Sequence, residues 1–307
     1  MSHDHESRSA HLASLELRPA GPRAGFLRGT IQSVRDIWAH RELLDLLVRR
    51  EIKARYKDSI LGFFWSLAKP LALLLVYYVA IGKFLGAERV PGREGGIPEF
   101  AIFIFTGLTA WQLFSDIILG GTGSIVANAG LIKKVYVPRE VFPLSVLGSS
   151  LFNFTIQLGI LVTATVVSGA FPLGQRWLYL PLALAVLIVF ASALALLLSA
   201  VNVYLRDVQY LVEIVIMILF WGSPIVYSWG LVHTRLEGSL LDTLYLMNPM
   251  TLVVVAFQRV FWVGGDGEAT PDSLTIRLLV TLGISMLLLW VSQRIFARLQ
   301  SNFAQEL

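Results

Sequence analysis

The sequence predicts an all-α polytopic membrane protein with six transmembrane helices, an N-terminal amphipathic interfacial helix and a re-entrant helical hairpin between the fifth and sixth spans. Three observations lead to this fold class. Of the 307 residues, 55% are hydrophobic and 15% are charged, whereas a soluble domain carries about 25% charged residues. The hydrophobic residues form runs long enough to cross a hydrocarbon core, which takes about 20 residues at about 1.5 Å each. Lysine and arginine cluster beside some of these runs and not others, as an oriented membrane protein requires.

The first part of the chain predicts a polar tail followed by a helix on the membrane surface. Residues 1–30 are expected to be a disordered cytoplasmic tail, and residues 31–58 an amphipathic interfacial helix. One side of this helix carries an apolar ridge at helical spacing: Leu44, Val48, Ile52 and Tyr56. The other side is expected to contact lipid headgroups. The candidate residues of the interfacial helix are Arg49, Arg50, Lys53, Arg55 and Tyr56.

Six apolar runs are the predicted spans of a membrane domain that covers residues 59–298. They are residues 60–85, 100–118, 142–168, 178–201, 211–228 and 276–295. Pro70, in the first run, removes a backbone donor and is expected to bend that helix. The second run is expected to continue as helix towards Ala127, and residues 299–307 are expected to be a cytoplasmic tail.

An apolar stretch between the fifth and sixth spans is interrupted by Asn248-Pro249. Because the residue before a proline is pushed out of the helical region, this stretch predicts two short helices rather than one span. We therefore expect a re-entrant hairpin over residues 240–263, with its broken backbone against protein or a water-filled cavity. The hairpin should then lie near a pore.

The basic residues predict that both termini are cytoplasmic. Five of them directly precede the first span: Arg49, Arg50, Lys53, Arg55 and Lys57. Positive charge is retained on the cytoplasmic side of a membrane, so this flank is expected to lie inside. A kinked seventh span in place of the hairpin is the alternative, but it would put Arg294 and Arg298 outside. In the loop after the fourth span, Arg206 and Asp207 are expected to form a local ion pair.

A short basic island, residues 130–140, lies between the second and third spans. A cationic, proline-stopped segment between two apolar runs is expected to lie at the cytoplasmic membrane surface, where a soluble partner can bind it. Lys133, Lys134 and Arg139 can pair with acidic groups of that partner, and Tyr136 can fill an apolar slot in it. The alternative is that the lysines only set the orientation of the chain.

The sequence contains no motif for nucleotide or metal chemistry. There is no Gly-x-x-x-x-Gly-Lys-Ser/Thr loop, no His-Glu-x-x-His motif and no cysteine. Asp116 and Glu213 are the main acidic residues inside the spans. Two carboxylates near the ends of spans are few for a proton relay across the membrane. We therefore expect no catalytic, cofactor or metal site in this chain, no nucleic-acid partner, and an energy source on another protein.

Several segments, in this order and at these spacings, resemble the Wzm/TagG-like permeases, the transmembrane subunits of bacterial type-2 ABC exporters for polysaccharides and polyol phosphates. The resemblance runs from about Arg41 onward. It rests on Arg49–Lys57, Leu61–Leu67 followed by Pro70, Asn128–Glu140, Tyr204–Val208, Ser223–Tyr227 and Asn248–Pro249.

The resemblance implies a homodimer in the bacterial cytoplasmic (inner) membrane, with two copies of a separate ABC ATPase that binds ATP and Mg. It implies that the substrate is a lipid-linked polysaccharide, such as an O-antigen-like glycan, a galactan or a teichoic acid precursor. It also implies that residues 130–140 are the coupling helix that docks in the ATPase. The broken hairpin would be the external gate, with Met247, Asn248 and Pro249 as its candidate residues. The residues of that contact would be Lys133, Lys134, Val135, Tyr136, Val137, Pro138 and Arg139.

A sugar chain crossing a membrane needs a wet path with flat faces. Aromatic rings cover the apolar C–H face of a sugar while its hydroxyls stay in water. The candidates for such a path are Trp65, Tyr77, Tyr78, Trp111, Phe114, Trp221 and Tyr227. For each of them, packing inside the bundle or in an interfacial belt is the alternative.

Three other functions remain open from the sequence. A type-2 ABC permease for a drug or a small lipid would carry the same broken hairpin. A membrane enzyme acting on polyprenyl-linked glycans would need a cluster of carboxylates, which the sequence lacks. A structural scaffold for envelope synthesis would not need ATP-dependent export.

Overall fold

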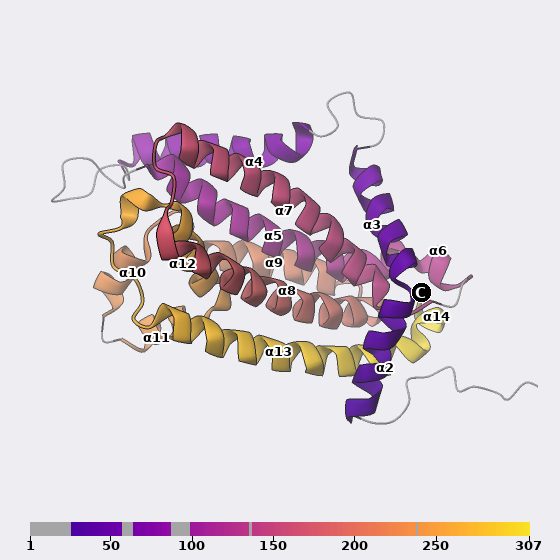
Figure 1. Ribbon diagram of the computed structural model, residues 1–307. Helices are drawn as coiled ribbons and strands as arrows, with labels where there is room; N and C mark the ends of the chain where they lie inside the picture. The colour runs from indigo at the N-terminus through magenta and orange to yellow at the C-terminus, as the bar shows by residue number, and fades with distance from the viewer. Residues whose placement is uncertain (1–25, 57–63, 87–98, 135–136, 238) are drawn as a thin grey trace, which may run out of the picture.

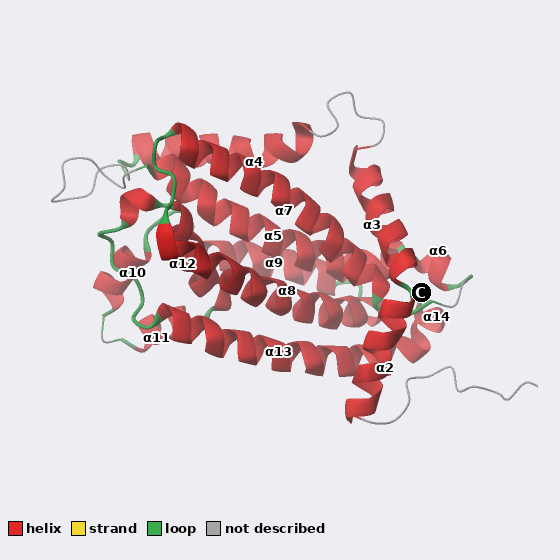
Figure 2. Cartoon of the chain, in the orientation of Figure 1, coloured by secondary structure: helices red, strands yellow, loops and turns green. Residues whose placement is uncertain are grey.

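The computed structural model describes residues 26–56, 64–86, 99–134, 137–237 and 239–307. Within these ranges the chain is helical and contains no strand (Figure 2). Most of the helices run side by side as one bundle, and two N-terminal helices lie across one end of it (Figure 1).

Four helices of the bundle are long and apolar enough to cross a membrane. They are α5 (Phe100–Ala127), α7 (Val141–Val167), α8 (Tyr179–Tyr204) and α13 (Leu274–Leu299). They confirm the second, third, fourth and sixth predicted runs as helices of spanning length. Helix α5 is the most buried of the four and packs against both α7 and α8, so it forms the centre of the core.

The first and fifth predicted spans differ from the four long helices. Helix α4 (Phe64–Tyr77) contains Pro70 and continues into a π-helix, η1 (Tyr78–Phe84). Helix α9 (Val208–Trp221) has 14 residues and is therefore about 21 Å long, less than the roughly 30 Å of a hydrocarbon core. The prediction that this helix reaches residue 228 is wrong, because Gly222 and Pro224 end it earlier.

The predicted interfacial helix consists of two helices, α2 (Phe26–Ala39) and α3 (Arg41–Tyr56). Helix α2 begins inside the segment that was expected to be a disordered tail. Both helices lie across the end of the bundle that also carries α6 (Ala129–Ile132) and the last residues of the chain (Figure 1). Helix α3 packs on α7 at Gly148, where an added Cβ would lie 2.6 Å from a methyl group of Val48.

The opposite end of the bundle holds the broken apolar stretch (Figure 1). Helix α10 (Trp229–Leu236) begins there after Ser228, whose hydroxyl accepts a hydrogen bond from the Leu231 N–H. It is followed by α11 (Leu240–Met247) and α12 (Pro249–Phe261), which meet at an angle of 76°. Short 3-10 turns η2 (Gly174–Leu178) and η3 (Val263–Gly265) complete this end.

Residues 299–307 are not the free tail that the sequence predicts. They form a 3-10 turn, η4 (Gln300–Asn302), and a last helical turn, α14 (Phe303–Glu306). Phe303 is fully buried in a second hydrophobic core at the α6 end of the bundle. That core also contains Leu47 of α3, Ile132 of α6 and Phe142 of α7.

Candidate functional site

The basic island, residues 130–140, follows α5 and is called the basic segment below. It has an exposed outer part and a buried inner part. Lys133 and Lys134 form an exposed turn after α6. Ile132 and Val137 point inward and pack in the second core. Val135 and Tyr136, predicted as partner contacts, lie outside the described residues. The lysines are therefore open to a partner, while the apolar residues around them fasten the segment to the bundle.

The base of this segment carries two polar contacts. The Arg139 guanidinium lies 5.7 Å from the ring centroid of Phe303. Glu140 is buried, and its Oε1 accepts a hydrogen bond of 3.4 Å from Gln300 Nε2. Burial raises the pKa of the Glu140 carboxyl, and the hydrogen bonds that it accepts only partly oppose this effect. Pro138, between Val137 and Arg139, is half-buried.

Helix α3 is hydrogen-bonded to Asn128, which lies just before the basic segment. Arg50 Nη2 donates to Asn128 Oδ1 at 2.6 Å and also to Glu51 Oε1 at 2.8 Å. Asn128 Nδ2 in turn donates to the Ser124 carbonyl of α5. Arg50 thus links α3 to the point where α5 ends and the basic segment begins.

The other predicted residues of this helix do not take part in that link. Arg49 pairs with Asp45 on the exposed face of α3 at 2.8 Å, and Lys53 is exposed. The side chains of Arg55 and Tyr56 lie outside the described part of the chain.

The break between α11 and α12 is tied to the end of α9 through one side chain. Asn248 Oδ1 caps α12 by accepting a hydrogen bond from the Met250 N–H at 3.0 Å. Its Nδ2 donates to Gly222 O at 3.3 Å and to Ser223 Oγ at 3.2 Å. Pro249 occupies the first turn of α12, where its missing N–H costs no hydrogen bond.

The irregular segment after α9 is held from two further directions. Gln258 Nε2 of α12 donates to the Pro224 carbonyl at 2.7 Å. On the α5 side, an added Cβ at Gly107 would lie 3.1 Å from a methyl group of Ile225. Two segments that carried the family resemblance, Ser223–Tyr227 and Asn248–Pro249, therefore form one contact. Met247, the third predicted gate residue, is exposed.

Three of the seven predicted path aromatics surround one cavity of about 250 Å³ between α4, α5 and α9. They are Tyr77, Trp111 and Trp221. Phe220, which was not among the predicted residues, also lines the cavity: its ring stacks on Tyr77 at 5.8 Å and meets Trp111 edge-on at 5.6 Å. Gln112 and Ser115 add polar groups to the wall, so the cavity combines flat apolar faces with hydrogen-bonding side chains.

The remaining path candidates lie elsewhere. Phe114 is fully buried and stacks on Phe190 of α8 at 5.9 Å, so it belongs to the core. Tyr78 lies beneath the ammonium group of Lys83, at 5.2 Å. The Tyr227 hydroxyl donates to the Trp221 carbonyl, and the side chain of Trp65 lies outside the described residues.

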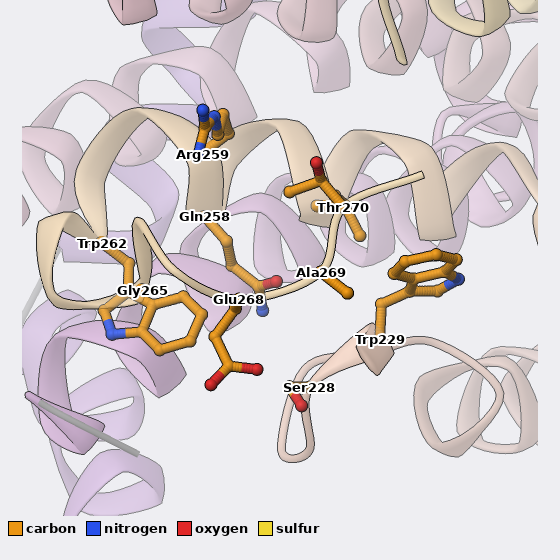
Figure 3. Close-up of a pocket in the computed structure, with 10 residues that line it drawn as sticks. Ser228, Trp229, Gln258, Arg259, Trp262, Gly265, Glu268, Ala269 and Thr270 are labelled. Atoms are coloured by element: carbon orange, nitrogen blue, oxygen red, sulfur yellow. The ribbon is translucent and has the colours of Figure 1, made fainter. Parts of the chain in front are cut away.

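A second, smaller cavity of about 30 Å³ lies at the hairpin end of the bundle (Figure 3). Glu268 and Gln258 point into the space between Trp262 and Ser228. The volume accommodates a water molecule but not a sugar ring. No sequence pattern indicated this cavity, because the loop that carries Glu268 has no helical periodicity.

The expected local ion pair between Arg206 and Asp207 is absent, although both residues are described and exposed. The two side chains point into solvent at the turn between α8 and α9. In the part of the chain that the structure describes, no group of three His, Asp or Glu side chains is arranged to hold a metal ion.

A bundle with four apolar helices of spanning length is typical of a membrane protein. Residues 42–262 match the family described as ABC-2 type transporter, and the chain belongs to this family.

Curated relatives extend the similarity over most of the chain. The chain is 31% identical over 277 residues to the O-antigen export system permease protein RfbA of Myxococcus xanthus. These 277 residues make up 90% of this chain, and the match covers 100% of that protein. It is 28% identical to the protein of the same name in Klebsiella pneumoniae, over 86% of this chain and 94% of that protein. It is 24% identical to the polysialic acid transport protein KpsM of Escherichia coli, over 80% and 91%.

Proposed function

We propose that the chain is the permease subunit of an ABC exporter that moves a lipid-linked polysaccharide across the bacterial cytoplasmic membrane. It would act as a homodimer with two copies of a separate ATPase, which binds ATP and Mg. The observation that carries the proposal is the similarity to an O-antigen export permease over 90% of the chain. ATP hydrolysis lies on the partner chain because this sequence has no phosphate-binding loop.

The cavity between α4, α5 and α9 is the proposed contact with the glycan. Its aromatic walls can stack on the C–H faces of sugars, and Gln112 and Ser115 can hydrogen-bond to hydroxyls. Helices α4 and α9 enclose it from two sides, so separating these helices would widen the cavity into a path. An apolar drug would gain little from the two polar side chains, which favours a hydroxyl-rich substrate.

In the proposed topology, α4 with η1 is the first span and α9 the fifth, which brings the count to six. Helices α11 and α12 then form a re-entrant hairpin, with Met247, Asn248 and Pro249 as the external gate. Helices α2 and α3 lie in the inner interface, with both termini cytoplasmic.

Because the chain has no cysteine, single cysteines at Gly130 and Leu240 can test the orientation with a membrane-impermeant maleimide. In intact cells only Leu240→Cys should be labelled.

The turn Lys133–Lys134 and the residues up to Arg139 are the proposed ATPase contact. The test is co-purification of the ATPase with the double variant Lys134→Ala, Tyr136→Ala. The variant should lose the ATPase and keep its thermal stability in detergent. Arg206→Ala, at the other exposed cytoplasmic turn, is the matched control and should keep the ATPase. A full ATPase complement on the double variant would contradict this contact.

A further inference from the structure

The segment Leu299–Leu307 packs against the base of the basic segment instead of extending into solvent. Gln300 contacts Glu140 through a hydrogen bond, and Phe303 lies beneath the Arg139 guanidinium at 5.7 Å. Two consecutive residues at the end of the basic segment are thus held by one short stretch of chain. Neither contact involves the exposed lysines, which stay open to a partner.

The same stretch is anchored in the bundle on its other side. The Phe303 ring meets Phe296 of α13 edge-on at 5.5 Å and Tyr204 of α8 at 6.2 Å. The Tyr204 hydroxyl donates a hydrogen bond of 2.7 Å to the Leu299 carbonyl. Phe303 therefore connects the base of the basic segment to two spanning helices at once.

The basic segment has little rigidity of its own. Helix α6 has only four residues, and a single helical turn is not stable in isolation. A segment of this kind transmits a displacement only if its base is held by a stiffer neighbour. The contacts of Gln300 and Phe303 provide that support.

We propose that Leu299–Leu307 is a seat for the coupling segment, which moves with Arg139 and Glu140 as one unit and passes their displacement to α8 and α13. Gln300 and Phe303 act as positioning residues, since neither would touch the ATPase or the glycan. The inference rests on the proposed function, because the displacement originates in the ATPase.

Distance measurements between spin labels test the seat directly. Gly130→Cys places a label on α6, where no atom lies within 4 Å of an added Cβ. Exposed Ser301 and Leu178 provide a second label on the seat and one at the far end of α8. The experiment compares the nucleotide-free complex with the vanadate-trapped complex, each containing the ATPase.

The 130–301 distance within one protomer should be unchanged by trapping, while the distance between the Leu178 labels of the two protomers shifts. A shift of the 130–301 distance as large as that between the two Leu178 labels would overturn the seat and leave the proposed function intact. No shift in either pair would contradict the ATP-driven displacement itself, and the seat with it.

Substitutions give a second, functional test. Gln300→Ala and Phe303→Ala should keep the ATPase bound but lower the glycan exported per ATP hydrolysed by about fivefold or more, the size of a typical coupling energy. Phe303→Leu should keep most of the coupling because it retains an apolar anchor, and exposed Asn302→Ala is the control. A variant that loses ATPase binding and export in equal proportion would show a merely structural role and refute the proposal.

Discussion

Replacement of Asn248 tests the contact at the proposed gate most sharply, because its side chain makes three hydrogen bonds at the break between α11 and α12. Asn248→Ala removes the cap on the Met250 N–H, which is worth about 1 kcal/mol. It also removes both bonds donated to Gly222 and Ser223, which are long at 3.3 and 3.2 Å and together contribute about 1 kcal/mol. We expect a loss of about 2 kcal/mol in the free energy of unfolding.

Asn248→Ser separates the two contributions. Its hydroxyl can still accept from the Met250 N–H, but it cannot reach Gly222 and Ser223, so we expect a loss of about 1 kcal/mol. Unfolding in mixed micelles with increasing denaturing detergent measures both variants against the parent chain. Equal stability of the parent, Ser and Ala forms would refute the view that Asn248 holds α12 to the end of α9.

Three further changes test other parts of the structure. Trp111→Ala should lower export by up to about tenfold, since an aromatic contact is worth about 0.5–1.5 kcal/mol, whereas Trp111→Phe should retain most of the export. Export by the reconstituted complex measures both variants. Unchanged export by the Ala variant would show that Trp111 does not line the proposed path. Gly148→Val should destabilise the chain by about 1–3 kcal/mol through a clash with Val48. Gly159→Ala, in open space on the same helix, should not destabilise it. Thermal unfolding in detergent measures both variants, and equal melting temperatures would contradict the α3–α7 contact. Burial raises the pKa of Glu140, so the folded state holds its proton more tightly than the unfolded state. Stability should therefore fall as pH rises from the usual glutamate range to the raised pKa, and Glu140→Gln should flatten that slope; an identical pH profile in the variant would contradict the buried carboxyl.

The long spans could be predicted from the sequence because hydropathy reports directly on length in an apolar environment. The end of α9 could not. Its irregular continuation is stabilised by Asn248 and Gln258, which come from a helix later in the chain, and such tertiary contacts leave no local signal. The packed segment 299–307 was missed although Leu299, Phe303 and Leu307 recur at helical spacing, because their partners in the second core lie largely on helices far away in the sequence.

The aromatic wall of the cavity between α4, α5 and α9 was predicted in part. Helix α5 is strongly apolar, and Gln112 and Ser115 give only a short polar signal for the face that meets the cavity. Trp111 and Phe114 were therefore equal candidates, although Trp111 lines the cavity and Phe114 stacks on α8. Phe220 was overlooked because it lies beside Trp221 in a uniformly apolar run.

The central claim is that this chain has no motor of its own and is driven through its basic cytoplasmic segment. The most direct measurement is movement of a radiolabelled lipid-linked glycan across sealed proteoliposomes, with and without the partner ATPase. Export should require both the ATPase and ATP, and Lys133→Glu, Lys134→Glu in the permease should abolish it. Export by the purified chain alone, at the same rate with or without nucleotide, would contradict the account.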